Sequence, residues 1–124
     1  MAKSAHQTVL DAPADVIDQA DKQIACSAQP TTYTEANATF ALADVAMTPN
    51  TDYTKAAGDV SGRKVTMAAK NGVNVDTSGT ANHIALVNTG SSTLLFVTTC
   101  SSQALTSGNT CNFPAWDIET GAPT

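Results

Sequence analysis

Short segments in which apolar and polar residues alternate follow one another through the second half of the sequence. RKVTMAA (63–69), HIALV (83–87), TLLFVTT (93–99) and AWDIE (115–119) are four of them, and the turn formers NTGSS and SGN lie between them. Alternation with a period of two is typical of half-buried strands, and strands at near-regular spacing are typical of sandwiches and barrels. The pattern therefore predicts an all-β protein, an antiparallel β-sandwich.

Two short signals refine these strands. Asn71-Gly72 follows the first of them and is a strong hairpin dipeptide, so it predicts a turn there. Pro114 has no N–H to donate to a strand ladder, so its strand is expected at a sheet edge or with a bulge.

The first half of the sequence has mixed spacing. Apolar residues from Val9 to Ile24 recur at intervals of three, four and seven, with Asp11 placed to cap and Pro13 in the first turn. This predicts one short N-terminal helix near 13–20.

Three further elements are expected before residue 63. QIACS (23–27) has the composition of a strand that leaves the helix. Thr32 and Glu35 have capping-box spacing, which predicts a single helical turn near 33–37. Residues 44–62 are rich in turn formers and predict a long surface loop.

At 124 residues the chain has the length of one domain, 1–124. Within it we expect a peripheral N-terminal arm (1–12), a segment of short helix, strand and long loop (13–62), and the main β-sheet core (63–119). The core assignment rests on the change to period-two alternation after Gly62.

Charge is scarce and unevenly distributed. Charged residues make up 14% of the chain, against about 25% in a typical protein. The chain has nineteen threonines, whose branched Cβ favours extended backbone. Residues 1–62 carry eight acidic residues and three lysines, whereas residues 63–124 carry three acidic and three basic residues. Without a basic stripe, nucleic acid and anionic membranes are poor partners. The acidic half is expected to be a solvated face or, alternatively, a docking surface for a basic partner.

Without a membrane span or a secretory signal, the chain is expected to be made in the cytoplasm. No apolar run reaches the roughly 20 residues of a membrane span, and residues 1–15 lack the apolar stretch of a secretory signal. Cys26, Cys100 and Cys111 are odd in number and lack CxxC spacing, which argues against a zinc site or a disulfide framework. Buried, inert thiols are the expectation, with a bridge between Cys100 and Cys111 as the alternative.

His83 is the most obvious candidate for chemistry. It alternates with the larger apolar residues Ile84 and Leu86, which we expect to face the core, so His83 should lie on the less buried face. A catalytic histidine needs a nucleophile or carboxylate within hydrogen-bond reach, and the sequence offers no such motif. We therefore interpret His83 as a structural or interface residue.

The acidic residues have a similarly plain interpretation. Asp11, Asp15 and Asp18 fall on one side of the predicted helix but lack a calcium-loop glycine, so a solvated face is expected. Asp117 and Glu119 share the outward face of the last strand; paired carboxylates can act on sugars, but solubility is the simpler interpretation. The sequence predicts no catalytic residue, no metal site and no cofactor.

Phe113 and Trp116 lie close together around Pro114. Trp116 is expected to seal one end of the core, contributing about 2 to 3 kcal/mol by burial. As an alternative it anchors a contact, because Trp is enriched at binding hot spots. His83, Phe113 and Trp116 are therefore the candidate interface residues.

The segments CSAQPTTYTEA, DVSGRKVTMAAKNGV, SGTANHIALV, LLFVTT, LTSGNT and PAWDIE carry a resemblance. Over nearly its whole length the chain resembles a family of small, mostly uncharacterised proteins encoded among the virion-structure genes of tailed bacteriophages and prophages. The second half also resembles the threonine-rich β-domains of phage tail and head-surface proteins. Cys111 departs from the β-branched residue usual at its place.

The resemblance implies a non-enzymatic structural protein of the virion, first of all one that decorates or stabilises the capsid surface. A tail, neck or fibre-attachment component is the second expectation. The implied partners are other virion proteins, namely the major capsid protein or tail and neck proteins, and copies of the chain in a homo-oligomer or symmetric array. A carbohydrate-binding or hydrolytic β-domain acting on the host envelope is the alternative of another class.

Overall fold

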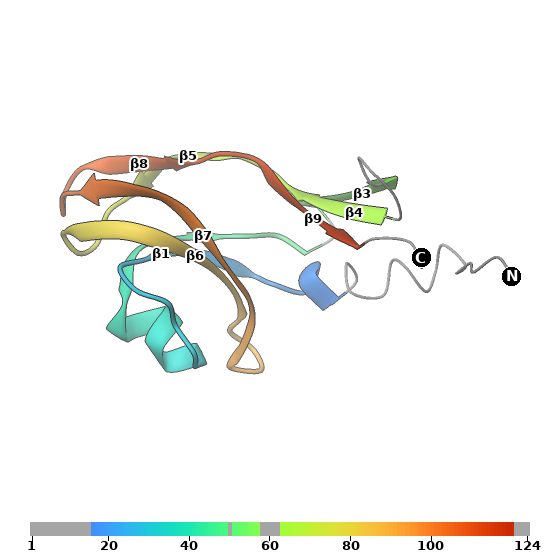
Figure 1. Cartoon of the computed structure of the whole chain (residues 1–124), viewed down its shortest axis with the longest axis horizontal. Helices are drawn as coiled ribbons and strands as arrows, with labels where there is room; N and C mark the ends of the chain where they lie inside the picture. Colours follow the sequence, from blue (N-terminus) through green and yellow to red (C-terminus); the bar gives the residue numbers. More distant parts are fainter. Residues whose placement is uncertain (1–15, 50, 58–62, 121–124) are drawn as a thin grey trace, which may run out of the picture.

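The described chain is mostly β-strand, and its strands lie in antiparallel sheets, which confirms the all-β prediction (Figure 1). The structure, a computed structural model, describes residues 16–49, 51–57 and 63–120, with the backbone alone for 119 and 120. The elements in chain order are β1 (Lys22–Cys26), η1 (Glu35–Thr39), β2 (Ala41–Ala46), β3 (Tyr53–Ala57), β4 (Arg63–Met67), β5 (Lys70–Asn74), β6 (Gly79–Asn88), β7 (Thr93–Leu105), β8 (Thr110–Phe113) and β9 (Trp116–Thr120).

β1 lies inside a four-stranded sheet in the order β2-β1-β6-β7, in which every neighbouring pair is antiparallel. Ile24 of β1 pairs with Asp44 of β2 on one side and with Ala85 of β6 on the other. The four residues of β1 after Lys22 are all buried, which requires that both faces of the strand be covered. The predicted strand QIACS therefore exists and occupies a central position.

The other strands pair in the orders β3-β4-β9 and β5-β8. Only two residues separate β4 from β5, and only Pro114 and Ala115 separate β8 from β9, so the same two stretches of chain run through both sheets. In Figure 1 these strands form an upper layer above β1, β6 and β7. Pro114 lies at the break between two strands, which is where a residue without an N–H disturbs a ladder least.

Two clusters of buried side chains fill the space between the layers. One joins Leu86 of β6 to Val65 and Met67 of β4, and the other joins Ala81 of β6 to Phe113 of β8. Burial of a side chain such as Leu or Met contributes about 1.5–3 kcal/mol, so these contacts hold the layers together. A third cluster lies on the opposite face of the four-stranded sheet and consists of Ile24, Cys26, Ala36, Ala85 and Val87.

The chain before β2 covers that opposite face. The Thr32 hydroxyl accepts a hydrogen bond from the Glu35 N–H at 3.1 Å, as the capping-box spacing predicts. The Glu35 carboxylate accepts in return from Thr31, from its N–H at 2.9 Å and its hydroxyl at 2.7 Å, one residue earlier than in the usual motif. The turn continues as the π-helical η1, whose Ala36 is fully buried against the sheet.

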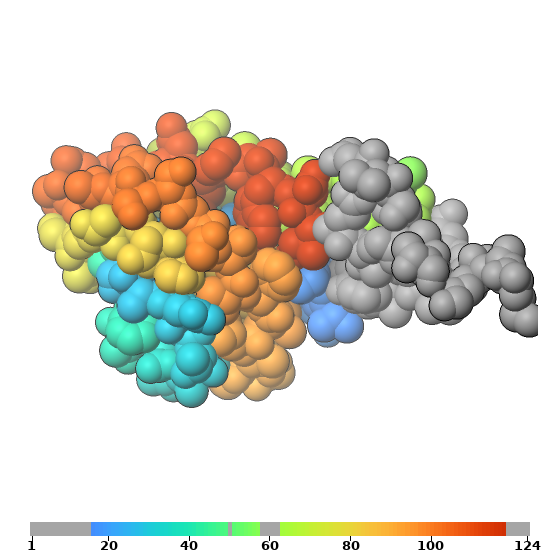
Figure 2. All heavy atoms as spheres, viewed as in Figure 1, coloured from blue at the N-terminus to red at the C-terminus, as the bar shows by residue number. Residues whose placement is uncertain are grey.

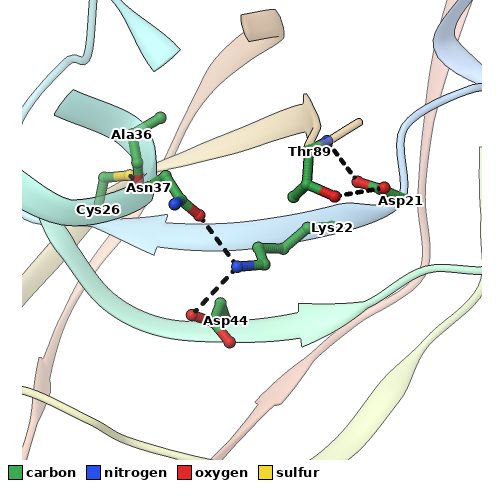
Figure 3. Close-up of polar contacts among 7 residues, drawn as sticks. All are labelled: Asp21, Lys22, Cys26, Ala36, Asn37, Asp44 and Thr89. Atoms are coloured by element: carbon green, nitrogen blue, oxygen red, sulfur yellow. Dashed lines mark hydrogen bonds and ion pairs between the residues drawn. The ribbon is translucent and has the colours of Figure 1, made fainter. Parts of the chain in front are cut away.

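Polar side chains tie the start of β1 to three neighbouring segments (Figure 3). Lys22 donates a hydrogen bond to the Asn37 side chain in η1 at 3.0 Å, and its ammonium lies 3.9 Å from the Asp44 carboxylate on β2. Asp21 accepts hydrogen bonds from the Thr89 N–H at 2.9 Å and hydroxyl at 2.6 Å. These contacts hold η1, β2 and the β6–β7 turn against one central strand.

The long loop predicted over residues 44–62 is wrong in part. It contains the end of β2 and the whole of β3, which pairs along its length with β4. Tyr53 of β3 is buried, and its hydroxyl donates to the Ala20 carbonyl at 2.7 Å. The segment DYTKAA alternates weakly, so pairing with β4 decides its conformation. Residues 58–62 of the predicted loop lie outside the described residues.

The hairpin turn predicted at Asn71-Gly72 is also wrong. Gly72 lies within β5 with a φ of +66°, where the pairing with β8 is irregular between Lys70 and Val73. Its N–H donates to the Asn112 side chain on β8 at 2.9 Å. The dipeptide does provide a left-handed backbone conformation, but the chain uses it for a bulge in a strand whose partner is distant in sequence.

The predicted helix over 13–20 is described only from residue 16. Residues 16 and 17 are helical, and a turn follows in which the Ala20 N–H donates to the Ile17 carbonyl at 2.9 Å. The predicted arm, 1–12, lies outside the described residues. In the described part of the chain, no helix combines the length and apolar character that crossing a bilayer requires.

Asp18 does not belong to a solvated face. Its side chain is buried, and its carboxylate lies 3.4 Å from the Lys55 ammonium of β3. An ion pair of this kind offsets the cost of removing the carboxylate from water. Asp11 and Asp15, the other two acids of the predicted face, lie outside the described residues.

Asp52 makes the stability of the fold sensitive to acid. Its carboxylate accepts a hydrogen bond from the Thr48 N–H at 2.6 Å and lies 3.0 Å from the Lys70 ammonium. Burial alone raises the pKa of Asp52, but these contacts outweigh burial and hold the pKa below its ordinary value of 3.8. Because the folded-state pKa is the lower one, the stabilisation is present above pH 3.8 and is lost as the pH falls through the folded-state pKa.

We expect Asp52→Asn to lower the free energy of unfolding at neutral pH by about 1–3 kcal/mol, because it removes a charged hydrogen-bond acceptor. The loss should shrink as the pH falls, since the wild-type carboxylate becomes protonated there. Urea unfolding at a series of pH values measures both effects, with the exposed Asp76→Asn as control. A constant difference between Asp52→Asn and wild type at every pH would contradict this assignment.

Candidate functional site

A cleft of about 480 Å³ opens between the two layers. Its walls come from β1, β6 and β7 in one layer and from β8, β9 and the break between them in the other. The volume lies within the roughly 300–1,000 Å³ of ligand pockets. No charged side chain of the described residues lines it; representative lining residues are Gln23, Ile84, Thr98, Gln103, Phe113 and Trp116.

The molecule is closed on the side away from this cleft. Val75, just after β5, forms a bridge with Ala43 of β2. The N–H groups of Asp76 and Thr77 both donate to the Leu42 carbonyl, at 2.8 and 3.0 Å. The segment 75–77 therefore covers the β2 edge of the four-stranded sheet and connects it to the upper layer.

β7 forms the other edge of that sheet and is open. Among the described strands it pairs with β6 alone. Its thirteen residues include no charged residue and no proline, which are two of the means by which proteins block an exposed edge. In Figure 2, β7 (orange) makes up much of the face in view, beside β6 (yellow) and β8 and β9 (red).

The backbone of β7 departs from regular pairing where it meets the cleft. The register runs from His83↔Thr99 to Ala81↔Gln103, so β7 has two extra residues in this interval. Thr98 to Ser101 line the cleft consecutively, which shows that backbone as well as alternate side chains forms its wall. An irregularity of this kind leaves the extra residues of β7 unpaired with β6 and bends the strand.

One end of the cleft is organised by a buried amide. Gln23 on β1 is 1% exposed, and its carbonyl oxygen accepts a hydrogen bond from the Trp116 indole N–H on β9 at 2.7 Å. The Gln23 amide nitrogen lies 3.7 Å from the Met47 sulfur. The Trp116 ring packs at a tilt against Phe96 of β7, with 6.1 Å between ring centroids. These contacts link the two layers and fix the Trp116 ring, which is half-buried.

The three cysteines are free thiols, and no bridge joins Cys100 to Cys111. Both of these residues line the cleft, Cys100 from β7 and Cys111 from β8, and burial raises the pKa of each thiol. Cys26 is fully buried on the other face of the sheet. Burial, with a smaller contribution from Cys100, raises its pKa to about 11, which agrees with an inert thiol.

His83 does not belong to the cleft. His83 lies directly opposite Cys26 of β1, so its side chain is on the face of the sheet that η1 covers. It is half-buried there. That face is more buried than expected, since Ala85 and Val87 on it are fully enclosed. The His83 Nδ1 lies 2.6 Å from the side-chain oxygen of its neighbour Asn82, which is a local hydrogen bond.

Asp117 of the last strand also lies away from the cleft lining. Asp117 is exposed, and its carboxylate lies 3.8 Å from the Lys64 ammonium on β4. The side chain of Glu119 lies outside the described residues. Within the described ranges no three His, Cys, Asp or Glu side chains gather in a way that could hold a metal ion.

The structure thus brings together two of the three candidate interface residues. Phe113 and Trp116 line one cleft, with Phe113 buried at its base, whereas His83 is elsewhere. Sequence reasoning missed Gln23 and the β7 wall. The available signal was the absence of Asp, Glu, Lys and Arg from the whole of residues 77–116.

Comparison of the chain with protein-family models, with curated proteins and with solved structures found no match.

The hydrogen bond between Gln23 and Trp116 should contribute measurably to stability. Gln23→Leu keeps the volume but leaves the indole N–H without its partner, so we expect a loss of about 1–3 kcal/mol in unfolding free energy. In a Trp116→Phe background the same change should cost less, because no N–H remains to be left unpaired. Urea unfolding of the four proteins in this double-mutant cycle gives the coupling energy. Additive effects would show that the bond does not join the layers.

Proposed function

We propose that this chain is a non-enzymatic structural protein of a tailed-bacteriophage virion that decorates or stabilises the capsid surface. The observation that supports it most is the neutral open edge, made of β7 and the adjoining cleft. This surface offers backbone hydrogen-bonding groups and apolar side chains, which suit pairing with another chain. General acid–base catalysis needs a titratable group of suitable pKa at the reacting atom, and the cleft lining offers only two thiols of raised pKa.

The proposal includes a finer description of the fold. We take the two layers as the halves of an antiparallel β-sandwich, because the clusters around Leu86 and Phe113 lie between them. We take residues 13–20 as one short N-terminal helix, supported by the helical residues 16 and 17. Such a domain packs its own core and leaves an edge for assembly.

The proposed partners are the major capsid protein, or tail and neck proteins, together with other copies of this chain in a symmetric array. The location is the virion, after synthesis in the host cytoplasm. The resemblance to β-proteins encoded among phage virion-structure genes motivates the proposed partners and location. On a symmetric particle a modest contact per subunit is repeated many times, so a small neutral surface is sufficient for retention. A tail, neck or fibre-attachment component would use the same surface.

A carbohydrate-binding domain is less well supported. Sugar recognition by an aromatic platform needs a free ring face, whereas the Trp116 ring packs against Phe96 and its N–H is bonded to Gln23. The nearby carboxylate, Asp117, is paired with Lys64. These contacts favour a structural role for Trp116.

The first test is the composition of the particle itself. Particles released from cells that carry the gene are purified by density gradient and analysed by mass spectrometry. We expect the chain at a copy number comparable with that of the other structural proteins. Its absence from intact particles would overturn the proposal.

The second test concerns the kind of contact. Residues 77–116 carry no formal charge, so attachment through them should persist when salt screens surface ion pairs, whose range is about 8 Å at physiological ionic strength. Purified particles are incubated at increasing salt concentrations, sedimented and examined by gel. We expect the chain to remain in the pellet. Release at moderate salt would show that the acidic half carries the interface.

A further inference from the structure

We infer that the open β7 edge pairs antiparallel with β7 of a second copy of this chain, so that two four-stranded sheets become one continuous sheet. This inference specifies the homo-oligomer contact of the proposed function and rests on that part of it. It does not require the particle, because the contact is expected in the purified protein.

The two edges of the four-stranded sheet differ in what covers them. At Leu42 and Ala43 the β2 edge is occupied by the chain's own segment 75–77, through the Val75–Ala43 bridge and two hydrogen bonds to Leu42. The β7 edge has no such cover among the described residues. A strand with a free edge is a template for another strand. β7 lacks the charged residues and proline that commonly protect such an edge, but its pairing with β6 is irregular between Thr99 and Gln103, so Phe96–Thr99 is the regular stretch beside that irregularity.

Charge favours a second copy as the occupant. In a two-fold interface a residue close to the axis lies near its own counterpart, so a charged residue there meets a like charge. β7 is neutral throughout, in a chain whose formal net charge is −5. In the symmetric register Thr99 lies opposite Thr99 of the other copy, which is a favourable cross-strand pair. The edge is thus suited to self-association in a chain that otherwise repels its copies.

The geometry also accounts for the cleft. The two-fold axis of an antiparallel strand pair runs perpendicular to the sheet, so both copies present their second layer on the same side. The two clefts, each lined by β7, β8 and β9, then face one another across the axis. Phe113 and Trp116 of both copies would border one shared apolar space. Burial of this surface adds to the backbone hydrogen bonds between the strands.

Symmetric pairing of the two strands has its centre at the middle of Thr93–Leu105, which is Thr99, the last residue before the irregular stretch of β7. The axis therefore passes close to Cys100, a free and half-buried thiol. In this arrangement Cys100 of each copy lies opposite Thr98 of the other, and the two Cys100 residues are diagonal neighbours on the same face of the sheet, about 7–8 Å apart. Cys111 on β8 lies farther from the axis, and Cys26 is fully buried.

The first experiment measures mass in solution. Light scattering after size-exclusion chromatography should give twice the 12.7 kDa of one chain, at low and high salt alike. Thr99→Lys places two ammonium groups at the axis and should give a monomer with an unchanged circular dichroism spectrum. Thr54→Lys makes the same exchange at an exposed site on β3, an edge strand of the other layer, and should remain dimeric. A monomeric wild type, or dimers in all three proteins, would overturn the inference.

The second experiment does not depend on a destabilising change. Mild oxidation with diamide removes two protons and two electrons from a pair of neighbouring thiols and joins them as a disulfide. We expect a covalent dimer on a non-reducing gel for wild type and for Cys111→Ser, and none for Cys100→Ser. Equal cross-linking in Cys100→Ser would place another surface at the contact and refute the pairing.

The two proposals fail in different ways. A dimer that is absent from purified virions would leave the β7 pairing intact and refute the virion function. A chain that is monomeric in solution but present in purified virions would refute the β7 pairing and leave the virion function intact.

Discussion

The hydrogen bond between Gln23 and Trp116 is the contact on which the arrangement of the layers depends most. Gln23 is nearly inaccessible on the central strand β1, and a buried amide left without a partner costs about 1–3 kcal/mol. Its oxygen meets the indole N–H of β9, 93 residues away in sequence, at 2.7 Å. Apolar packing alone would permit the layers to slide, whereas this directional contact specifies where β9, and with it β4, lies over the sheet.

The second constraint is the unequal treatment of the two sheet edges. Segment 75–77 crosses from the upper layer and bonds to β2, so one side of the molecule is closed by its own backbone. On the other side β7 bends away at its irregular pairing with β6, and a cleft remains between it and β8. The chain thus hydrogen-bonds to its own β2 edge through segment 75–77, whereas the β7 edge has no such partner among the described strands. That asymmetry is the observation on which we base the proposal of association.

Charged residues are also distributed unequally, and they are absent from the strand that forms the open edge. The ion pairs Lys55–Asp18, Lys70–Asp52 and Lys64–Asp117 involve strands of the upper layer. A fourth pair, Lys22–Asp44, joins β1 to β2 in the four-stranded sheet, at the side away from β7. Residues 77–116, which include β6, β7 and β8, contain no Asp, Glu, Lys or Arg. Charged contacts therefore serve the interior organisation of the domain, and the open edge is left neutral. A neutral edge has little penalty of desolvation when another strand covers it.

The sequence by itself determined the fold class and most of the strands. Alternation in RKVTMAA, HIALV and TLLFVTT was sufficient, because every second residue of a half-buried strand faces the core and this gives the sequence a period of two. The capping pair Thr32 and Glu35 was predictable for the same reason, since its partners are three residues apart. These are features in which the physical cause and the sequence signal lie in one short segment.

Only the tertiary structure decided which partner each strand has and where the cleft lies. β3 is a strand because β4 pairs with it, and Gly72 forms a bulge because β5 pairs with β8 rather than with β4. Phe113 and Trp116 were predictable as neighbours, but Gln23, Cys100 and Cys111 join them through pairings that cross up to 93 positions. His83 does not join the cleft, because its side chain is on the opposite face of the sheet. Alternation predicted that face to be the less buried one, but η1 covers it. Long-range pairing leaves no local periodicity, so the sheet order and the open edge had to come from the folded chain.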